Sequence, residues 1–180
     1  MFLESVMLQR AQRYEVQALA VIYDQYSPRL YRYALRLLGD EELAEECVAE
    51  TFNRFLAALK YGKGPNKYLQ AYLFRVAHNW VTDYYRSRPQ PVSLSDENDM
   101  VDSGSELDVK FVEEHQKERV RNALTLLTSE QRQVVVLKYL EDWENQQIAA
   151  AVNKPIGAVK ALQHRALNSL RRILNEESAS

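Results

Sequence analysis

Five polar side chains recur at helical spacing between residues 71 and 86 and could bind nucleic acid. The residues are Arg75, His78, Asn79, Thr82 and Arg86. Their spacing predicts one face of a helix, with apolar residues on the other face. Arginine can bind phosphate, while the other side chains can donate hydrogen bonds or stack on a base. We therefore predict that this polar stripe contacts a nucleic acid.

The loop before this helix mixes basic and aromatic residues. It contains Tyr61, Lys63, Lys67 and Tyr68 beside two glycines and a proline. Such a mixture suits single strands, whose bases stack on rings while phosphates meet lysines. Tyr61 and Tyr68 could equally complete a small core, and the sequence leaves these two interpretations even.

The stretch from Gln146 to Leu174 has the pattern of a helix-turn-helix. Ile148 and Val159 fall on inward positions, and Asn153 occupies a turn that needs a left-handed backbone. The outward face of the second helix then carries Lys160 and Arg165, which can contact a major groove. The alternative is an ordinary helical hairpin with a basic surface.

The segment from Asp40 to Glu50 holds six carboxylates and no basic residue. Glu45, Glu46 and Glu50 can face outward from a helix, which would repel DNA. This face could simply be solvated, or it could dock a basic protein partner.

The total composition excludes several classes of protein. The 180 residues carry 23 basic and 25 acidic side chains, so the net charge of −2 does not reveal that some segments are basic. The single cysteine permits no internal disulfide, and the sequence shows no signal peptide or span, so we expect a cytoplasmic protein. We expect no catalytic residue, metal, cofactor or small-molecule substrate, because the histidines are scattered and the glycines lack P-loop spacing.

The periodicity predicts an all-α protein of two small helical domains joined by a flexible acidic linker. Within 16–38 we expect two helices separated at Ser27-Pro28, followed by helices at about 41–59 and 71–86. The predicted linker at 89–112 is rich in Pro, Ser, Asp and Gly. Thr128 and Gln131 predict a capping box that opens a helix through Tyr139. The helices of the second domain are expected at about 112–127, 145–152 and 156–174.

These motifs, in this order, resemble the extracytoplasmic-function (ECF) sigma factors of the sigma-70 family. Residues 23–59 look like the family's polymerase-binding segment, and "AYLFRVAHNWVTDYYR" is similar to its −10 reading and melting helix. Residues 124–174 look like its −35 reading domain. The resemblance implies region 2 at 1–88, region 4 at 113–180, and a role in promoter-specific transcription initiation. It also implies core RNA polymerase, promoter DNA and an anti-sigma factor, often at the membrane, as partners.

The resemblance assigns three groups of residues. Those implied for the −10 element and single-stranded DNA are Tyr61, Lys63, Lys67, Tyr68, Arg75, His78, Asn79, Thr82 and Arg86. Those implied for the −35 element are Lys154, Gly157, Lys160, Ala161, His164 and Arg165. Those implied for core polymerase are Glu45, Glu46, Glu50, Phe52 and Arg54.

Two other functions remain compatible with the sequence. A free-standing helix-turn-helix regulator would bind a duplex without polymerase, typically as a dimer on a palindrome. A purely protein-binding helical adaptor would leave both basic segments unexplained.

Overall fold

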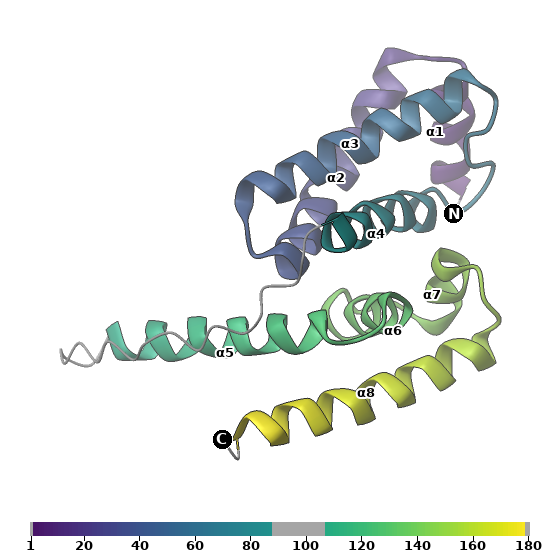
Figure 1. Cartoon of the computed structure of the whole chain (residues 1–180). Coiled ribbons are helices and arrows are strands. Elements are labelled where there is room, and N and C mark those ends of the chain that lie inside the picture. The colour runs from purple at the N-terminus through teal and green to yellow at the C-terminus, as the bar shows by residue number, and fades with distance from the viewer. Residues whose placement is uncertain (1, 88–106, 179–180) are drawn as a thin grey trace.

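The computed structural model describes residues 2–87 and 107–178, and every regular element in these two ranges is a helix. Four helices precede the gap and the remaining helices follow it, as Figure 1 shows. The all-α prediction is confirmed. Most of the linker predicted at 89–112 lies outside the described residues.

The first domain contains α1 (Phe2–Gln12), α2 (Val16–Leu38), α3 (Glu41–Lys60) and α4 (Leu69–Ser87). Helix α1 was not expected from the sequence. Its Leu8 and Ala11 are buried in the common core. Its Gln12 donates to the carbonyl of Pro65 at 3.1 Å, so α1 helps to position the loop before α4.

The prediction of two helices separated at Pro28 is wrong, because α2 runs unbroken from Val16 to Leu38 with Pro28 inside it. Proline removes one helical hydrogen bond and crowds the preceding turn. The buried positions nevertheless continue at helical spacing on both sides, from Ile22 and Tyr26 to Leu30 and Tyr33. Burial of this continuous apolar face keeps the two halves in one helix.

The second domain contains α5 (Leu107–Thr125), α6 (Ser129–Val135), η1 (Val136–Leu140), α7 (Asn145–Val152) and α8 (Ile156–Ser178). The predicted capping box is confirmed: the backbone N–H of Gln131 donates to the Thr128 hydroxyl, and the Gln131 side chain accepts from the Thr128 N–H. Helix α5 begins five residues before the expected start at Val112.

The helix expected to run through Tyr139 changes its hydrogen bonding at Val136. Residues 136–140 form the π-helical turn η1, which the sequence did not predict. The Glu141 N–H donates to the Val136 carbonyl, and the Trp143 N–H donates to the Leu137 carbonyl. This turn ends the helix and places Glu141 and Trp143 against the first domain.

The two domains pack against each other, with α4 on α7 and α2 on α5. In Figure 1 the α4 helix runs alongside the helices of the second domain. Buried residues of both domains form one apolar cluster, which includes Phe74 of α4 and Trp143 of the second domain. The face of α4 that turns towards this contact includes two of the residues expected to bind DNA, His78 and Thr82.

Candidate nucleic-acid interface

The loop between α3 and α4 exposes two tyrosines. Tyr61 is 71% exposed and Tyr68 is 62% exposed, so neither ring completes a core. Gly62 and Tyr68 both have positive φ, at 66° and 56°. A left-handed backbone is uncommon for a residue such as tyrosine, and it turns the chain sharply into α4. The loop therefore presents both rings to solvent, beside the exposed Lys63 and Lys67.

The polar stripe on α4 is only partly exposed. Asn79 and Arg86 are exposed, Arg75 is half-buried, and Arg86 lies 3.8 Å from the Asp83 carboxylate. His78 and Thr82 differ from the expectation of an open polar face. His78 is buried at 2% exposure and Thr82 is half-buried, because Ser129 of the second domain lies against both.

The hydrogen bonds of His78 define its protonation. Its Nδ1 lies 2.8 Å from the Tyr33 hydroxyl, and its Nε2 lies 3.0 Å from the Ser129 carbonyl oxygen. A carbonyl oxygen only accepts, so Nε2 carries the proton and Nδ1 accepts from Tyr33. Burial, reinforced by the positive charge of Arg132, lowers the pKa of His78 to about 4, although the bond to Ser129 opposes this shift. His78 is therefore a neutral side chain near pH 7.

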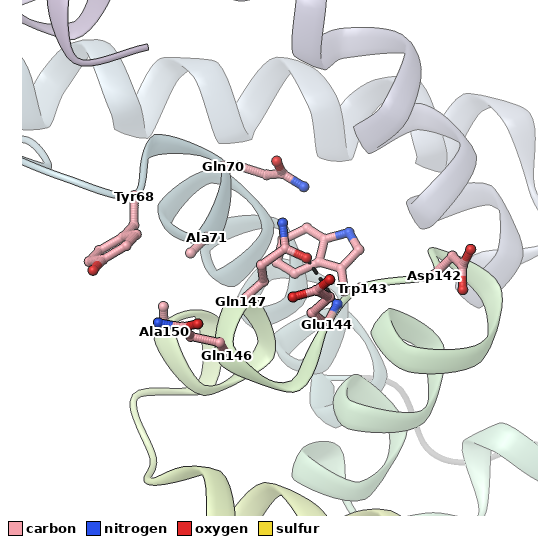
Figure 2. Close-up of a pocket in the computed structure, with 9 residues that line it drawn as sticks. All are labelled: Tyr68, Gln70, Ala71, Asp142, Trp143, Glu144, Gln146, Gln147 and Ala150. Carbon is pink, nitrogen blue, oxygen red and sulfur yellow. Dashed lines mark hydrogen bonds between the residues drawn. The ribbon is translucent and has the colours of Figure 1, made fainter. Parts of the chain in front are cut away.

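A cleft of about 540 Å³ lies where the start of α4 meets α7 and the loop before it. Figure 2 shows Tyr68 at one side of this cleft, with Gln147 and Trp143 across from it. The lining is mixed, with amide, carboxylate and aromatic groups from both domains. The predicted −10 loop therefore borders the contact between the domains.

The helix-turn-helix has the turn that the sequence predicted. Asn153 adopts the left-handed conformation at φ 53° and ψ 47°, and its N–H donates to the Ala149 carbonyl. Gln163 of α8 donates to Asn145 of α7 at 2.7 Å, which fixes the two helices relative to each other. Ile148 and Val159 are fully buried between them.

The outward face of α8 is open to solvent. The exposed residues of the predicted −35 group are Gly157, Lys160, Ala161, His164 and Arg165. Lys154 is the exception, because its ammonium group pairs with Glu130 at 2.9 Å. An exposed helix face with two cations and a small residue between them fits a major groove.

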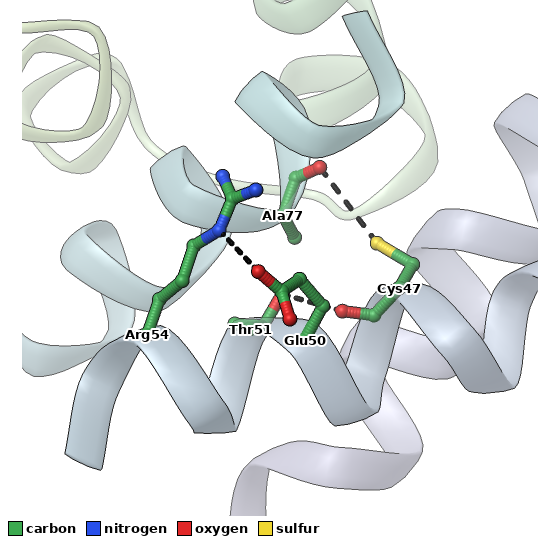
Figure 3. A network of polar contacts seen from close by, with 5 residues as sticks. All are labelled: Cys47, Glu50, Thr51, Arg54 and Ala77. Atoms are coloured by element: carbon green, nitrogen blue, oxygen red, sulfur yellow. Dashed lines mark hydrogen bonds and ion pairs between the residues drawn. The ribbon is translucent and has the colours of Figure 1, made fainter. Parts of the chain in front are cut away.

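The acidic face of α3 is also exposed to solvent at Glu45 and Glu46. Glu50 pairs with Arg54 at 2.7 Å, as Figure 3 shows. On the inner side, Thr51 donates to the Cys47 carbonyl at 2.7 Å, and the Cys47 thiol lies 3.7 Å from the Ala77 carbonyl oxygen of α4. The Thr51 bond lies within α3, whereas the Cys47 contact joins the inner side of α3 to α4 and leaves the acidic side facing outward.

Phe52 lies at the base of a groove rather than on an open surface. Its side chain is 8% exposed and its ring is 4.8 Å from the ring of Tyr23. The groove is apolar, has a volume of about 300 Å³, and is lined by Val16, Leu19, Ala20, Tyr23, Phe52, Phe55 and Leu56. It adjoins the acidic face of α3 and adds apolar area to it.

Local sequence patterns did not predict the residues that join the two domains. They did not single out four residues that make contacts over 47 to 105 positions of sequence: Ser129, Glu141, Trp143 and Arg36. A tryptophan in a short polar loop was the one local signal, since a large exposed ring there would need a partner. Among the described residues, no group of three or more metal-ligating side chains occurs, and no helix is long and apolar enough to span a membrane.

Comparisons with known proteins identify similar sequences over most of the chain. Residues 22–89 match the model of Sigma-70 region 2, and residues 117–170 match that of Sigma-70, region 4. The ECF RNA polymerase sigma factor SigL of Mycobacterium tuberculosis is 30% identical over 164 residues, which cover 90% of this chain and 92% of SigL. The ECF RNA polymerase sigma factor BldN of Streptomyces coelicolor is 29% identical over 181 residues, and the match covers 96% of this chain and 66% of BldN.

Solved structures share the fold. A structure of CnrH in complex with the cytosolic domain of CnrY has a TM-score of 0.71 at 21% identity, and the match covers 96% of this chain and 97% of CnrH. The sigma factor RpoE of Bartonella quintana, in complex with the anti-sigma factor NepR, has a TM-score of 0.57 at 22% identity, with 87% of this chain and 96% of RpoE covered. These similarities support the helical architecture.

Proposed function

The chain belongs to the ECF sigma factors of the sigma-70 family, and from this premise we propose how its surfaces bind core RNA polymerase and a promoter. The observation that supports this most directly is the match of both domains, in order, to the two sigma regions. The protein acts by binding and positioning, and polymerase supplies the catalysis. We place this activity in the cytoplasm, where polymerase and DNA meet.

The α3–α4 loop and the polar face of α4 bind the −10 element as it becomes single-stranded. Tyr61 and Tyr68 are exposed rings on which unpaired bases can stack, worth about 1–3 kcal/mol per base. Lys63, Lys67 and Arg75 supply positive charge beside them, and Asn79 donates and accepts hydrogen bonds. Flipping a base costs a few kcal/mol, which stacking of this size can offset.

The outward face of α8 binds the −35 element as duplex. Lys160 and Arg165 can reach phosphate or guanine, while Gly157 and Ala161 allow close approach of the helix. His164 is exposed on the same face. The ion pair of Lys154 with Glu130 makes Lys154 the weakest candidate of this group.

The acidic face of α3 docks core polymerase. Glu45, Glu46 and the Glu50–Arg54 pair offer a charged rim, and Phe52 with its apolar groove offers buried area. A charged rim around an apolar centre is the usual anatomy of a protein interface. The structure of RpoE with the anti-sigma factor NepR further supports an anti-sigma factor as a regulatory partner, which would hold this chain at the membrane if it were anchored there.

The experiment that tests this proposal compares DNA binding with and without core polymerase. A pool of random duplexes is offered to the purified chain alone and to the chain with core enzyme, and bound duplexes are sequenced. The sigma assignment predicts enrichment of a two-part motif only with core enzyme, since each domain alone binds weakly and gains from being fixed on polymerase. Enrichment of a palindrome by the chain alone would contradict it.

A further inference from the structure

The end of α1 is bonded to the loop that precedes α4. Gln12 is the last residue of α1, and its side-chain Nε2 donates to the Pro65 carbonyl oxygen at 3.1 Å and to the Asn66 Oδ1 at 3.3 Å. Within the described ranges 2–87 and 107–178, no other hydrogen bond reaches residues 64–67. Gln12 and Asn66 belong to none of the groups that the sequence assigned to DNA or to polymerase.

The backbone that carries Gln12 is itself held in place. Leu8 and Ala11 of α1 are buried, at 2% and 0% exposure. The Tyr14 hydroxyl, just beyond the end of α1, donates to the Leu56 carbonyl of α3 at 2.8 Å. Tyr14 has a φ of 59°, which is uncommon for tyrosine and turns the chain sharply after α1. The Gln12 side chain therefore extends from a fixed point towards the loop.

The loop has a packed base and an open tip. A Cβ on the half-buried Gly64 would lie 2.5 Å from the Leu59 Cδ2, so the backbone here lies close against the end of α3. Pro65 is also half-buried, whereas Asn66 and Lys67 are exposed. Packing thus fixes the base of the loop, while Gln12 supplies the hydrogen bonds that fix its tip.

The carbonyl of Pro65 determines how both amides are turned. A carbonyl oxygen only accepts, so the Gln12 amide must direct its nitrogen towards the loop. The same nitrogen lies against Asn66, which must therefore turn its oxygen towards Gln12 and its nitrogen away. The two N–H groups of Asn66 have no partner among the described residues. The tip of the loop therefore presents a hydrogen-bond donor to solvent.

We propose that Gln12 is a positioning residue for recognition of the −10 element, which holds Asn66 so that its amide donates to a carbonyl oxygen of an unpaired base. This inference rests on the proposed function of the α3–α4 loop. Guanine O6 and thymine O4 accept hydrogen bonds, whereas adenine and cytosine carry an amino group at the corresponding place. Asn66 then favours guanine or thymine at one position of the −10 element.

Transcription from a library with a randomised −10 region tests this inference. Each template carries a transcribed barcode, and the full chain is supplied together with core RNA polymerase. With the wild type, we expect one −10 position to favour guanine or thymine over adenine and cytosine. Gln12→Ala should reduce this preference by at least about threefold, since the Asn66 amide loses the hydrogen bond that orients it. Gln9→Ala, at an exposed position of α1 outside this contact, should leave the preference unchanged.

A change of one atom in the Gln12 side chain should redirect the preference. In Gln12→Glu the carboxylate only accepts, so Asn66 should turn its nitrogen towards α1 and its oxygen towards the base. The preference should then shift towards adenine or cytosine, whose amino groups donate. Gln9→Glu adds the same charge to α1 without this contact and should cause no shift.

Asn66→Asp tests the same assignment without altering α1. It replaces the amide donor with an acceptor on an exposed side chain, so folding should be preserved. The base preference should shift in the same direction as in Gln12→Glu, while the −35 motif and the affinity for core enzyme should not change. This variant decides the role of Asn66 even if changes at Gln12 reduce the amount of folded protein.

The outcomes separate this inference from the proposed function. Equal base frequencies in the wild type and in Asn66→Asp would overturn it, as would equal frequencies in the Gln12 and Gln9 variants. A wild-type −10 motif with no position that favours guanine or thymine would also overturn it. So would a uniform fall in transcription at unchanged base preference, because Gln12 would then only stabilise the fold. A wild-type chain that binds core enzyme but yields no specific starts would instead overturn the proposed function.

Discussion

His78 shows how far residue types can predict a role. It lies at helical spacing from Arg75 and Thr82 on α4, but it is buried where an open polar face was expected. Its burial was not predictable, because its two partners, Tyr33 and Ser129, lie 45 and 51 positions away. A histidine placed between two such partners is held in one tautomer and kept neutral.

The buried state of His78 predicts a loss of stability in acid. The pKa is lowered to about 4 in the folded chain, against an unfolded value near 6.5. The unfolded state therefore binds more protons between these values, so the stabilisation is complete above pH 6.5 and is lost as the pH falls towards 4. Between pH 6.5 and pH 5 we expect the free energy of unfolding to fall by about 2 kcal/mol on this account, at 1.36 kcal/mol per pKa unit.

Urea unfolding of the wild type and of His78→Gln at several pH values measures this effect. The neutral amide does not titrate, so the difference between the two proteins isolates His78 from the carboxylates. A difference that stays constant from pH 7 to pH 5 would show that His78 is not buried in the free chain.

Among the helices, local sequence signals predicted where a helix begins or ends better than they predicted whether a helix continues. The Thr128–Gln131 capping box and the left-handed Asn153 were both predicted correctly, because their chemistry lies within a few residues. Pro28 was misread as a boundary, since the burial that holds α2 together comes from other helices. The π-turn η1 was also missed, for it depends on where Glu141 and Trp143 pack.

Gly39 couples a helix end to the contact between domains. It ends α2 at φ 70°, and a Cβ placed there would lie 2.4 Å from the Arg121 guanidinium of α5. Gly39→Ala therefore has two contributions to its free-energy cost. One is an alanine in the left-handed conformation, and the other is the displacement of the Arg121 guanidinium. Gly62 has a similar φ of 66° with open space around it, so Gly62→Ala serves as the matched control.

We expect Gly62→Ala to lower the free energy of unfolding by about 1 kcal/mol, and Gly39→Ala by about 2 kcal/mol. Urea denaturation of the two variants and the wild type measures both values. Equal losses would mean that displacing the Arg121 guanidinium has no measurable cost.

The exposed face of α8 predicts a separable loss of DNA binding. Lys160→Glu should weaken binding of the polymerase complex to duplex carrying the −35 motif by about tenfold or more, since it replaces a cation at the groove with an anion. Lys117→Glu makes the same change on α5, away from this face, and should have little effect. Titration of labelled duplex provides the measurement, and equal losses in both variants would indicate a general effect of charge.

At the scale of the whole molecule, the order of the two domains was predictable and their contact was not. The basic segments, the acidic helix and the helix-turn-helix each have local patterns, and together they indicated both family regions. The contact of the first domain with the second depends on pairs such as Arg36 of α2 with Glu141, which are 105 positions apart. No periodicity in a single sequence reports a pairing at that distance.

Transcription from a promoter library measures whether this chain directs core RNA polymerase to promoters. Purified core enzyme is supplied with the library, with and without the chain, and the 5′ ends of the transcripts are sequenced. We expect transcription starts that appear only when the chain is added and that share a −35 motif and a −10 motif at fixed spacing. Identical starts with and without the chain, under conditions where the chain binds core enzyme, would contradict it.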